Sequence, residues 1–282
     1  MRSNRALREN ELIPDQVLLP FRGIADFFVR CLAALSEARL GDVGVTLVDT
    51  GTPDAEVARM AGFCKDLGLD LTLVRGTGRE IFDRKYLLPA WGGVPRRVIM
   101  LNSDTIPTPG FAQRLLGALD LDPKRKFASA VSTTPLDIII HRAGFEDGSE
   151  TTLLERVYRY HQQRQARYAG QVTDCAFANM TCAALDWAAW AEVAPGETPF
   201  DYGHHYDLHI GNLLRDAGYT LGVCEDCAVY HIGHATFRQV EFEQLYDNLL
   251  GRTLQYIDRW GHLPEHFALM HEMLYTSERF PH

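Results

Sequence analysis

The sequence contains no apolar run of the length that crosses a lipid bilayer, which takes roughly 18 uncharged apolar residues. Residues 1–11 are polar and charged, without the apolar stretch of a signal peptide. Basic residues are also in the minority, because 28 Lys and Arg stand against 37 Asp and Glu, for a net charge of −9. That balance argues against binding nucleic acid by charge alone, which needs a basic face. We therefore expect a cytoplasmic protein.

Cysteine is scarce, and its spacing lacks the pattern of a zinc ribbon. Six cysteines are scattered along 282 residues, most of them within apolar stretches. A single Cys-x-x-Cys motif joins Cys224 and Cys227, with no second pair at a suitable distance. We predict reduced, buried thiols, with structural zinc or redox chemistry at this motif as the alternative.

Neither an internal repeat nor a Gly/Ser-rich linker divides the chain, which favours one domain over two. The 46% hydrophobic and 23% charged residues exclude a disordered or low-complexity chain. In the first half, short apolar runs alternate with amphipathic stretches. This alternation predicts a largely parallel sheet with helices on its faces, whose ligands bind beyond the carboxyl ends of the strands. The expected strands are 16–20, 43–48, 69–74 and 97–101, and the expected helices are 24–39, 55–67 and 109–119.

The second half is less regular. Its most distinctive segment is a predicted helix over 151–169, rich in Arg and Tyr. This helix could face an anionic acceptor, or it could be a solvated face or a dimer contact. The remaining predictions are strands at 127–132, 219–223 and 228–231, and helices at 208–217 and 237–260.

Two aspartates follow buried strands and so lie where ligands bind. Asp104 comes after the apolar run Val98-Ile-Met-Leu101, and carboxylate oxygens are ligands that Mg²⁺ and Mn²⁺ prefer. Asp49 ends the strand 43–48 and precedes a Gly-containing turn, where a carboxylate can accept a hydrogen bond from a base or ribose. The plainer interpretation of both is an aspartate that closes a turn or caps the next helix.

A third aspartate, Asp207, lies among three histidines in the segment His204-His-Tyr-Asp207-Leu-His209. Its carboxylate could act as a general base toward an acceptor hydroxyl, or it could be a favourable charge in the first turn of a helix. His231 and His234 follow a strand-like run, so either could complete a metal site with Asp104, although lone histidines are more often structural.

Over about residues 16–261, the order of these segments resembles that of family 2 glycosyltransferases, in their rhamnosyltransferase-like form. Val45-Thr-Leu-Val-Asp49-Thr-Gly is similar to the family's first Asp segment, and Asn102-Ser-Asp104-Thr to its Asp-x-Asp segment. The other similar segments are Tyr206-Asp207 through Ala217-Gly-Tyr219 (catalytic base), Ala228 through Thr236 (metal-binding His) and Tyr256-Ile-Asp-Arg-Trp-Gly261.

The resemblance implies an α/β fold of the GT-A type in a single domain, 1–282. Its central sheet would be mostly parallel with helices on both faces, beside a smaller acceptor-side part and a long C-terminal helix. Residues 16–125 would form the nucleotide-sugar-binding half, 126–237 the acceptor and catalytic half, and 238–282 a C-terminal helical extension. The implied activity is inverting transfer of a sugar from a nucleotide-diphosphate sugar to an acceptor hydroxyl, with Mg²⁺ or Mn²⁺ as cofactor.

The resemblance also implies roles for individual residues. Asp207 would be the general base, and Asp104 with His231 would hold the metal ion on the diphosphate. The acceptor would be a glycan, a lipid-linked sugar or a small metabolite, with a peptide or a modified nucleic-acid base also open, as is a homodimer. The other expected contacts are Pro20, Phe21, Arg22, Asp49, Arg79, Asn102 and Ser103, with Asp104, for the nucleotide sugar, and Asn179, His204, His205, Tyr206 and His234 for the acceptor.

Departures from the family pattern keep two other functions open. Asn102 replaces the first acid of Asp-x-Asp, and Tyr206 and His209 replace acids on either side of Asp207. These changes allow a weakened metal site or a non-catalytic binding protein on the same fold. A nucleotidyltransferase that makes sugar nucleotides would need a Gly-rich N-terminal loop, whereas Leu19-Pro-Phe-Arg-Gly23 has one glycine.

Overall fold

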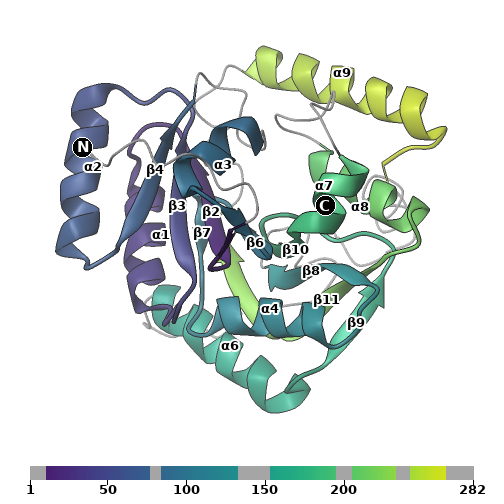
Figure 1. Cartoon of the computed structure of the whole chain (residues 1–282), viewed down its shortest axis with the longest axis horizontal. Helices are drawn as coiled ribbons and strands as arrows, with labels where there is room; N and C mark the ends of the chain where they lie inside the picture. The colour runs from purple at the N-terminus through teal and green to yellow at the C-terminus, as the bar shows by residue number, and fades with distance from the viewer. Residues whose placement is uncertain (1–10, 77–83, 133–152, 195–204, 233–241, 265–282) are drawn as a thin grey trace, which may run out of the picture.

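The computed structural model describes residues 11–76, 84–132, 153–194, 205–232 and 242–264. Strands gather at the centre of the molecule and helices surround them (Figure 1). The strands are β1 (Leu12–Ile13), β2 (Gln16–Phe21), β3 (Gly44–Asp49), β4 (Leu71–Arg75), β5 (Val94–Pro95), β6 (Arg97–Leu101), β7 (Thr105–Ile106), β8 (Arg125–Ser132), β9 (Val172–Cys175), β10 (Cys182–Asp186) and β11 (Thr220–His231). The helices are α1 (Asp26–Glu37), α2 (Asp54–Asp66), α3 (Arg84–Trp91), α4 (Phe111–Asp120), α6 (Leu153–Tyr168), α7 (Trp187–Val193), α8 (Tyr206–Asp216) and α9 (Phe242–Trp260).

The main sheet has the strand order β4-β3-β2-β6-β10-β8-β11-β7, and β9 pairs with β11. The first four strands of this order are parallel, as the alternating strands and helices of the first half predict. The rest is mixed, because β10 runs antiparallel to both β6 and β8 while β8 and β11 are parallel. The expectation of a mostly parallel sheet therefore holds for the first half only.

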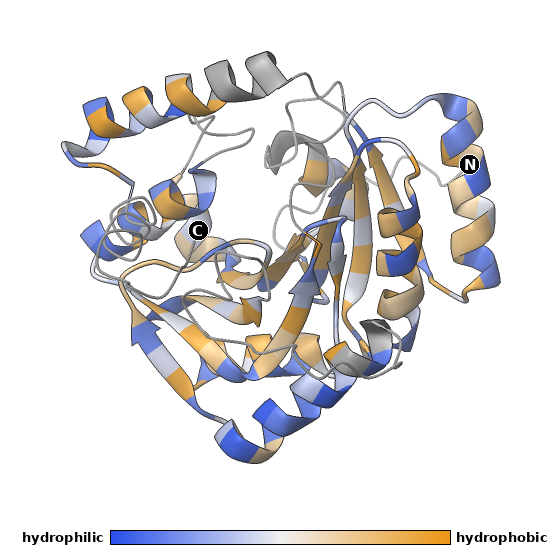
Figure 2. Cartoon of the chain, turned by 180° about the vertical axis from the view of Figure 1, so that it is seen from behind, coloured by the Kyte–Doolittle hydropathy of each residue, from blue (hydrophilic) through white to orange (hydrophobic). Residues whose placement is uncertain are grey.

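Each face of the sheet buries its own hydrophobic cluster. Helices α1, α2 and α4 pack on one face, and α3, α7, α8 and one side of α9 pack on the other. Strands β2, β3 and β6 are mainly apolar, whereas α6 is mainly hydrophilic (Figure 2). The six cysteines are free, and five of them are buried, as predicted. Among the described residues, no helix is long and apolar enough to span a membrane.

The second half departs from its predicted elements at three places, one of which is the unpredicted short strand β9. The strands expected at 219–223 and 228–231 form one strand, β11, which contains an irregularity between Cys224 and Ala228. The short strand β10 and helix α7 follow one another without a loop. Neither was predicted, because both are too short to show a regular spacing of apolar residues. A capping signal is present at their junction, because the Asp186 carboxylate accepts a hydrogen bond from the Ala189 N–H at 3.0 Å.

Candidate functional site

The carboxyl ends of the parallel strands bring three of the sequence-predicted site segments to one edge of the sheet, with Arg75 beside them. In the ladder, Phe21 at the end of β2 pairs with Asp49 at the end of β3, which pairs with Arg75 at the end of β4. Asn102 directly follows β6, the neighbour of β2 on the other side. Sheets of this kind bind ligands beyond this edge.

Asp104 and His231 meet although 127 positions separate them in the chain. The His231 Nε2 lies 3.0 Å from an Asp104 carboxylate oxygen, and both side chains are largely buried. Strand β7 brings them together by pairing with β11, so that His231 stands opposite Thr105. The Ile232 N–H also donates to the Asp104 carbonyl oxygen at 2.9 Å. Asp104 is thus held by its backbone and its side chain, and it does not cap α4, which begins after Gly110.

Three further polar residues surround this pair. The Thr181 hydroxyl lies 3.5 Å from the His231 Nδ1, and the Thr181 carbonyl accepts from the Asn102 N–H at 2.9 Å. The Asn179 side-chain oxygen accepts from the Thr181 N–H at 3.2 Å. Asn102 and Asn179, predicted for the donor and the acceptor respectively, are therefore both linked through Thr181 to the Asp104–His231 pair. Thr181 itself was not predicted, because a lone threonine carries no signal in the sequence.

The pair fits a divalent cation that is bound together with a phosphorylated ligand. One carboxylate and one imidazole are suitable ligands for Mn²⁺, and Mg²⁺ also commonly relies on one or two carboxylates plus substrate phosphates. Within the described ranges, no cluster of three or more His, Cys, Asp or Glu side chains forms a complete protein site. Oxygen atoms of a ligand or of water would therefore have to supply the remaining positions.

Asp49 is committed to its own turn. One carboxylate oxygen accepts from the N–H groups of Gly51 and Thr52 at 3.1 and 2.8 Å, and the other forms an ion pair with the Arg75 Nε at 2.7 Å. The side chain is 0% exposed. Asp49 therefore has the contacts of a turn-closing aspartate, the plainer of the two interpretations, and its contact with the nucleotide stays a prediction.

Arg75 is the residue that the sequence interpretation missed at this edge. Besides Asp49 it contacts the Asp54 carboxylate at 2.8 Å and the Thr52 carbonyl at 3.0 Å, yet 44% of its side chain is exposed. A guanidinium has five N–H groups, and these contacts use three of them. The prediction ended this strand at Val74, which placed Arg75 in a loop; the ladder places it next to Asp49.

The other residues predicted to contact the donor differ in how far their side chains are buried. The Phe21 side chain packs in the core, because it is 3% exposed and stacks on Phe28 with ring centroids 4.9 Å apart. Pro20 is half-buried, Arg22 is exposed and Ser103 is 9% exposed. Arg79 lies outside the described residues.

Asp207 lies in the first turn of α8, where a negative charge is favourable. Its carboxylate accepts from the Leu208 N–H at 2.9 Å, and the side chain is half-buried. The N-cap of α8 is His205, whose φ of 71° is unusual for a residue other than glycine. Its Nε2 lies 2.9 Å from the Thr253 hydroxyl of α9, which supports this backbone conformation. Backbone strain of this kind is concentrated at functional sites.

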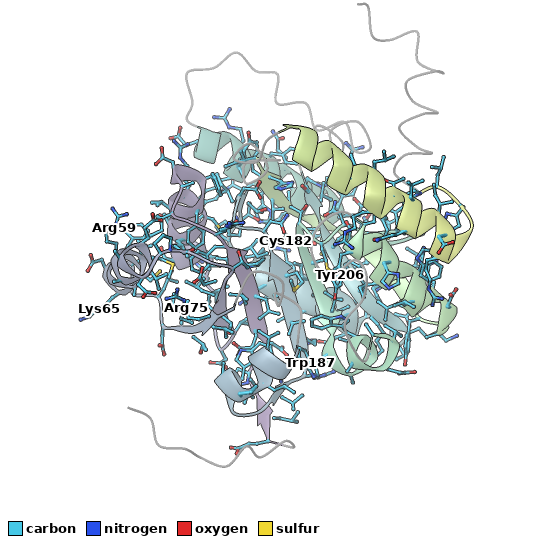
Figure 3. The ribbon with its side chains drawn as sticks, turned by 90° about the horizontal axis from the view of Figure 1, so that it is seen from above. Arg59, Lys65, Arg75, Cys182, Trp187 and Tyr206 are labelled. Atoms are coloured by element: carbon cyan, nitrogen blue, oxygen red, sulfur yellow. The ribbon has the colours of Figure 1, made fainter. Side chains whose placement is uncertain are left out.

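Two residues predicted to bind the acceptor lie in the packing around α8. The side chain of Tyr206 is 4% exposed, and its hydroxyl accepts from the Trp190 Nε1 at 3.1 Å. His205 is also 4% exposed and is held by α9. Viewed from above, Tyr206 and Arg75 lie on opposite sides of Cys182, which begins β10 (Figure 3). The predicted acceptor residues His204 and His234 lie outside the described residues.

The Arg-rich helix α6 packs along β11, so at least part of its charge is used inside the protein. Arg164 forms an ion pair with the Glu225 carboxylate, and its Nε donates to the Glu225 carbonyl at 2.6 Å. The Arg164 side chain is 10% exposed. Arg159 remains exposed. Arg164 is therefore already paired inside the protein, and it does not support the hypothesis that this helix faces an anionic acceptor.

Comparison with known proteins places this geometry in a known fold. No protein-family model matches the sequence, and no curated protein matches it significantly. Among solved structures, the chain is similar to the mannosyltransferase PcManGT from Pyrobaculum calidifontis, solved in complex with GDP-Man and Mn²⁺, with a TM-score of 0.57. The two share 17% sequence identity over 94% of this chain and 70% of the other. The chain therefore has a fold found in a glycosyltransferase.

Proposed function

We propose that this protein is a glycosyltransferase that transfers a sugar from a nucleotide-diphosphate sugar to an acceptor hydroxyl. The observation that carries the proposal is the Asp104–His231 pair at the ligand edge of a glycosyltransferase-like sheet. The mannosyltransferase with this fold was solved with a nucleotide sugar and Mn²⁺, which are the kinds of ligand that such a pair suits.

On the donor side, Asp104 and His231 would hold Mg²⁺ or Mn²⁺ against the diphosphate. When bound, the cation neutralises the negative charge that develops on the leaving nucleoside diphosphate. The half-exposed guanidinium of Arg75 would donate to oxygen atoms of the nucleotide, while Asp49 keeps it in place. Asn102 would donate a hydrogen bond to the diphosphate. Because its side chain is neutral, it would not repel the negative charge of the diphosphate as a carboxylate at this position would.

On the acceptor side, Asp207 would be the general base. The acceptor oxygen attacks the anomeric carbon as the carbon–oxygen bond to the diphosphate breaks, and the electron pair leaves with the nucleoside diphosphate. The acceptor proton passes to the Asp207 carboxylate. Because attack comes from the face opposite the leaving group, the configuration at the anomeric carbon is inverted in a single displacement.

A thermal-shift titration tests the donor part of this proposal. UDP, GDP, dTDP and CMP are each added with and without Mn²⁺, because a ligand that binds the native state raises the melting temperature. We expect one nucleotide to stabilise the protein, and Mn²⁺ to increase that effect in the wild type but not in Asp104→Asn. Asp70→Asn changes an exposed carboxylate and is the matched control. If no nucleotide stabilises the wild type, the proposal is wrong.

Catalysis is tested separately, by following release of the nucleoside diphosphate from a panel of UDP, GDP and dTDP sugars with Mn²⁺. Slow hydrolysis without an acceptor is expected for one donor. A protein that binds a nucleotide but never turns it over would instead be a non-catalytic binding protein. Formation of pyrophosphate from a sugar phosphate and a nucleoside triphosphate would identify a nucleotidyltransferase.

A further inference from the structure

The segments that carry Asp104 and His231 are joined to each other at both ends. At one end, the Ile232 N–H donates to the Asp104 carbonyl oxygen at 2.9 Å. At the other end, the Thr108 hydroxyl donates to the Ala228 carbonyl oxygen at 2.6 Å. The short ladder between β7 and β11 lies between these two bonds. The distance between the two site side chains therefore depends on how residues 104–109 are aligned with residues 228–232.

One buried imidazole from α6 bridges the same two segments. The His161 Nδ1 accepts a hydrogen bond from the Ala228 N–H at 3.3 Å, so the ring proton resides on Nε2. The Nε2 lies 3.2 Å from the Pro109 carbonyl oxygen, and its N–H is shared between that oxygen and the side-chain amide oxygen of Gln165 on the same helix. The Thr108 hydroxyl is also 3.2 Å from Nδ1. His161 is 3% exposed, and no step of the proposed reaction uses it.

The alignment needs such support because β11 is irregular just before Ala228. Cys224 pairs with Ala130 and Ala228 pairs with the next residue, Val131, so three residues of β11 are left out of the ladder. If β11 instead continued regularly and Glu225 paired with Val131, every later residue would move by three positions. Because strand side chains alternate between faces, an odd shift would turn His231 to the opposite face of the sheet.

The residues left out of the ladder are held by the helices around them. Asp226 is 3% exposed, forms an ion pair with Arg114 of α4 at 2.7 Å and accepts from the Gly170 N–H at 2.8 Å. Glu225 forms its ion pair with Arg164 of α6, one turn along from His161. The three-residue insertion, Glu225 through Cys227, thus includes the second cysteine of the Cys-x-x-Cys motif and is held by α4 and α6.

We propose that His161 is a positioning residue for the Asp104–His231 pair, which it acts on by joining Ala228 to the Pro109 segment. This inference rests on the proposed function, in that it takes the pair to be the ligands of a divalent cation. The main task of α6 is then to present His161 and Arg164 to β11, rather than to bind an acceptor.

The test compares His161→Phe with a matched control, His209→Phe. Both residues are buried histidines with one imidazole nitrogen accepting a hydrogen bond, from Ala228 N–H in the first case and from Trp260 Nε1 in the second. Phenylalanine fills a similar volume but makes neither bond. The readout is the dissociation constant of Mn²⁺ in the presence of GDP or UDP, measured by electron paramagnetic resonance of free Mn²⁺. Binding of the same nucleotides without metal is measured in parallel.

We expect His161→Phe to weaken Mn²⁺ binding by about tenfold, the lower end of the effect of residues that orient metal ligands. Metal-free nucleotide binding should stay unchanged, and His209→Phe should leave the Mn²⁺ constant unchanged. His161→Gln keeps an N–H that can reach the Pro109 carbonyl, so it should lose less affinity, and it replaces His161→Phe if the latter does not fold.

Wild-type Mn²⁺ affinity in a folded His161→Phe protein would overturn the positioning role and leave the proposed function intact. Equal losses in His161→Phe and His209→Phe would also overturn it, because they would indicate general destabilisation. A wild-type protein that binds nucleotide without any dependence on Mn²⁺ would instead contradict the metal site itself, and with it the proposed function.

Discussion

The two halves of the sheet hold their polar edge residues in different ways. In the first half, Asp49 is held by neighbours within its own parallel strands and turn, and its contacts lie within 26 residues of the chain. In the second half, Asp104 and His231 are joined across 127 positions. The contacts of Asp49 follow from local sequence, whereas the Asp104–His231 pair depends on the alignment of distant strands. The proposed chemistry depends on the Asp104–His231 pair.

The largest effect should come from the second half, at Asp207. Asp207→Asn removes the proposed base while keeping the size of the side chain, so turnover should fall by about 10²–10⁴-fold. Binding of the donor nucleotide should be unchanged, which initial rates and thermal shifts measured on the same preparation would show. Turnover at the wild-type rate would remove Asp207 from the mechanism and leave the acceptor half without an assigned base.

The next largest effect concerns the long-range pair. His231→Ala should weaken Mn²⁺ binding in the presence of a nucleoside diphosphate by about 10–100-fold, because one of the two proposed metal ligands is lost. His262→Ala is a suitable control, since this histidine is exposed near the end of α9. Isothermal titration with Mn²⁺ measures both variants. Equal affinities would show that the second half does not hold the metal.

In the first half, the expected effect is on stability. Asp49→Ala leaves the N–H groups of Gly51 and Thr52 and the guanidinium of Arg75 without their partner. Loss of these bonds should lower the free energy of unfolding by about 1–3 kcal/mol, with the half-exposed Arg75 limiting the loss. Urea denaturation measures it. A wild-type free energy of unfolding would show that the turn does not depend on Asp49.

The last effect concerns the pH dependence of stability, and it comes from the buried histidines. Burial lowers the pKa of His161 and of His209 to about 4, from an ordinary value of 6.5. Between these values the unfolded chain binds protons that the folded protein does not, so stability should fall as the pH is lowered from 6.5 toward 4. Above pH 6.5 this contribution is fully present.

Urea denaturation at pH 7.0, 6.0 and 5.0 checks this dependence. The double variant His161→Phe with His209→Phe should show a weaker loss of stability between pH 6.5 and 5 than the wild type. An equal loss in both proteins would assign the dependence to other groups. Because one of these histidines lies at the β11 alignment and the other beside α9, the single variants report on the two places separately.

The sequence predicted the first half of the fold well because its periodicity is local. The strands ending at Asp49 and Leu101 and the helix α1 are recognisable from residues that are neighbours in the chain. Strand β10 was missed because its four apolar residues, between a loop and the Asp186 cap of a helix, carry no period. Likewise, β11 was divided in two because the insertion between Cys224 and Ala228 resembles the end of one strand and the start of another.

The candidate site was predictable only where a resemblance supplied long-range information. No local pattern joins Asp104 to His231; the family resemblance predicted both, and the structure brings them together. The same resemblance predicted Phe21 and Tyr206 as ligand contacts, but both side chains are buried by packing that sequence order does not reveal. Arg75 and His161 were missed because their partners, Asp49 and Ala228, become neighbours only through strand pairing and helix packing.

Anomalous diffraction at the manganese edge, from crystals grown with Mn²⁺ and the nucleoside diphosphate that stabilises the protein, tests the central claim most directly. The account predicts one strong anomalous peak between the Asp104 carboxylate and the His231 Nε2, with diphosphate oxygens completing the coordination. A well-ordered nucleotide whose manganese lies away from both residues would contradict it.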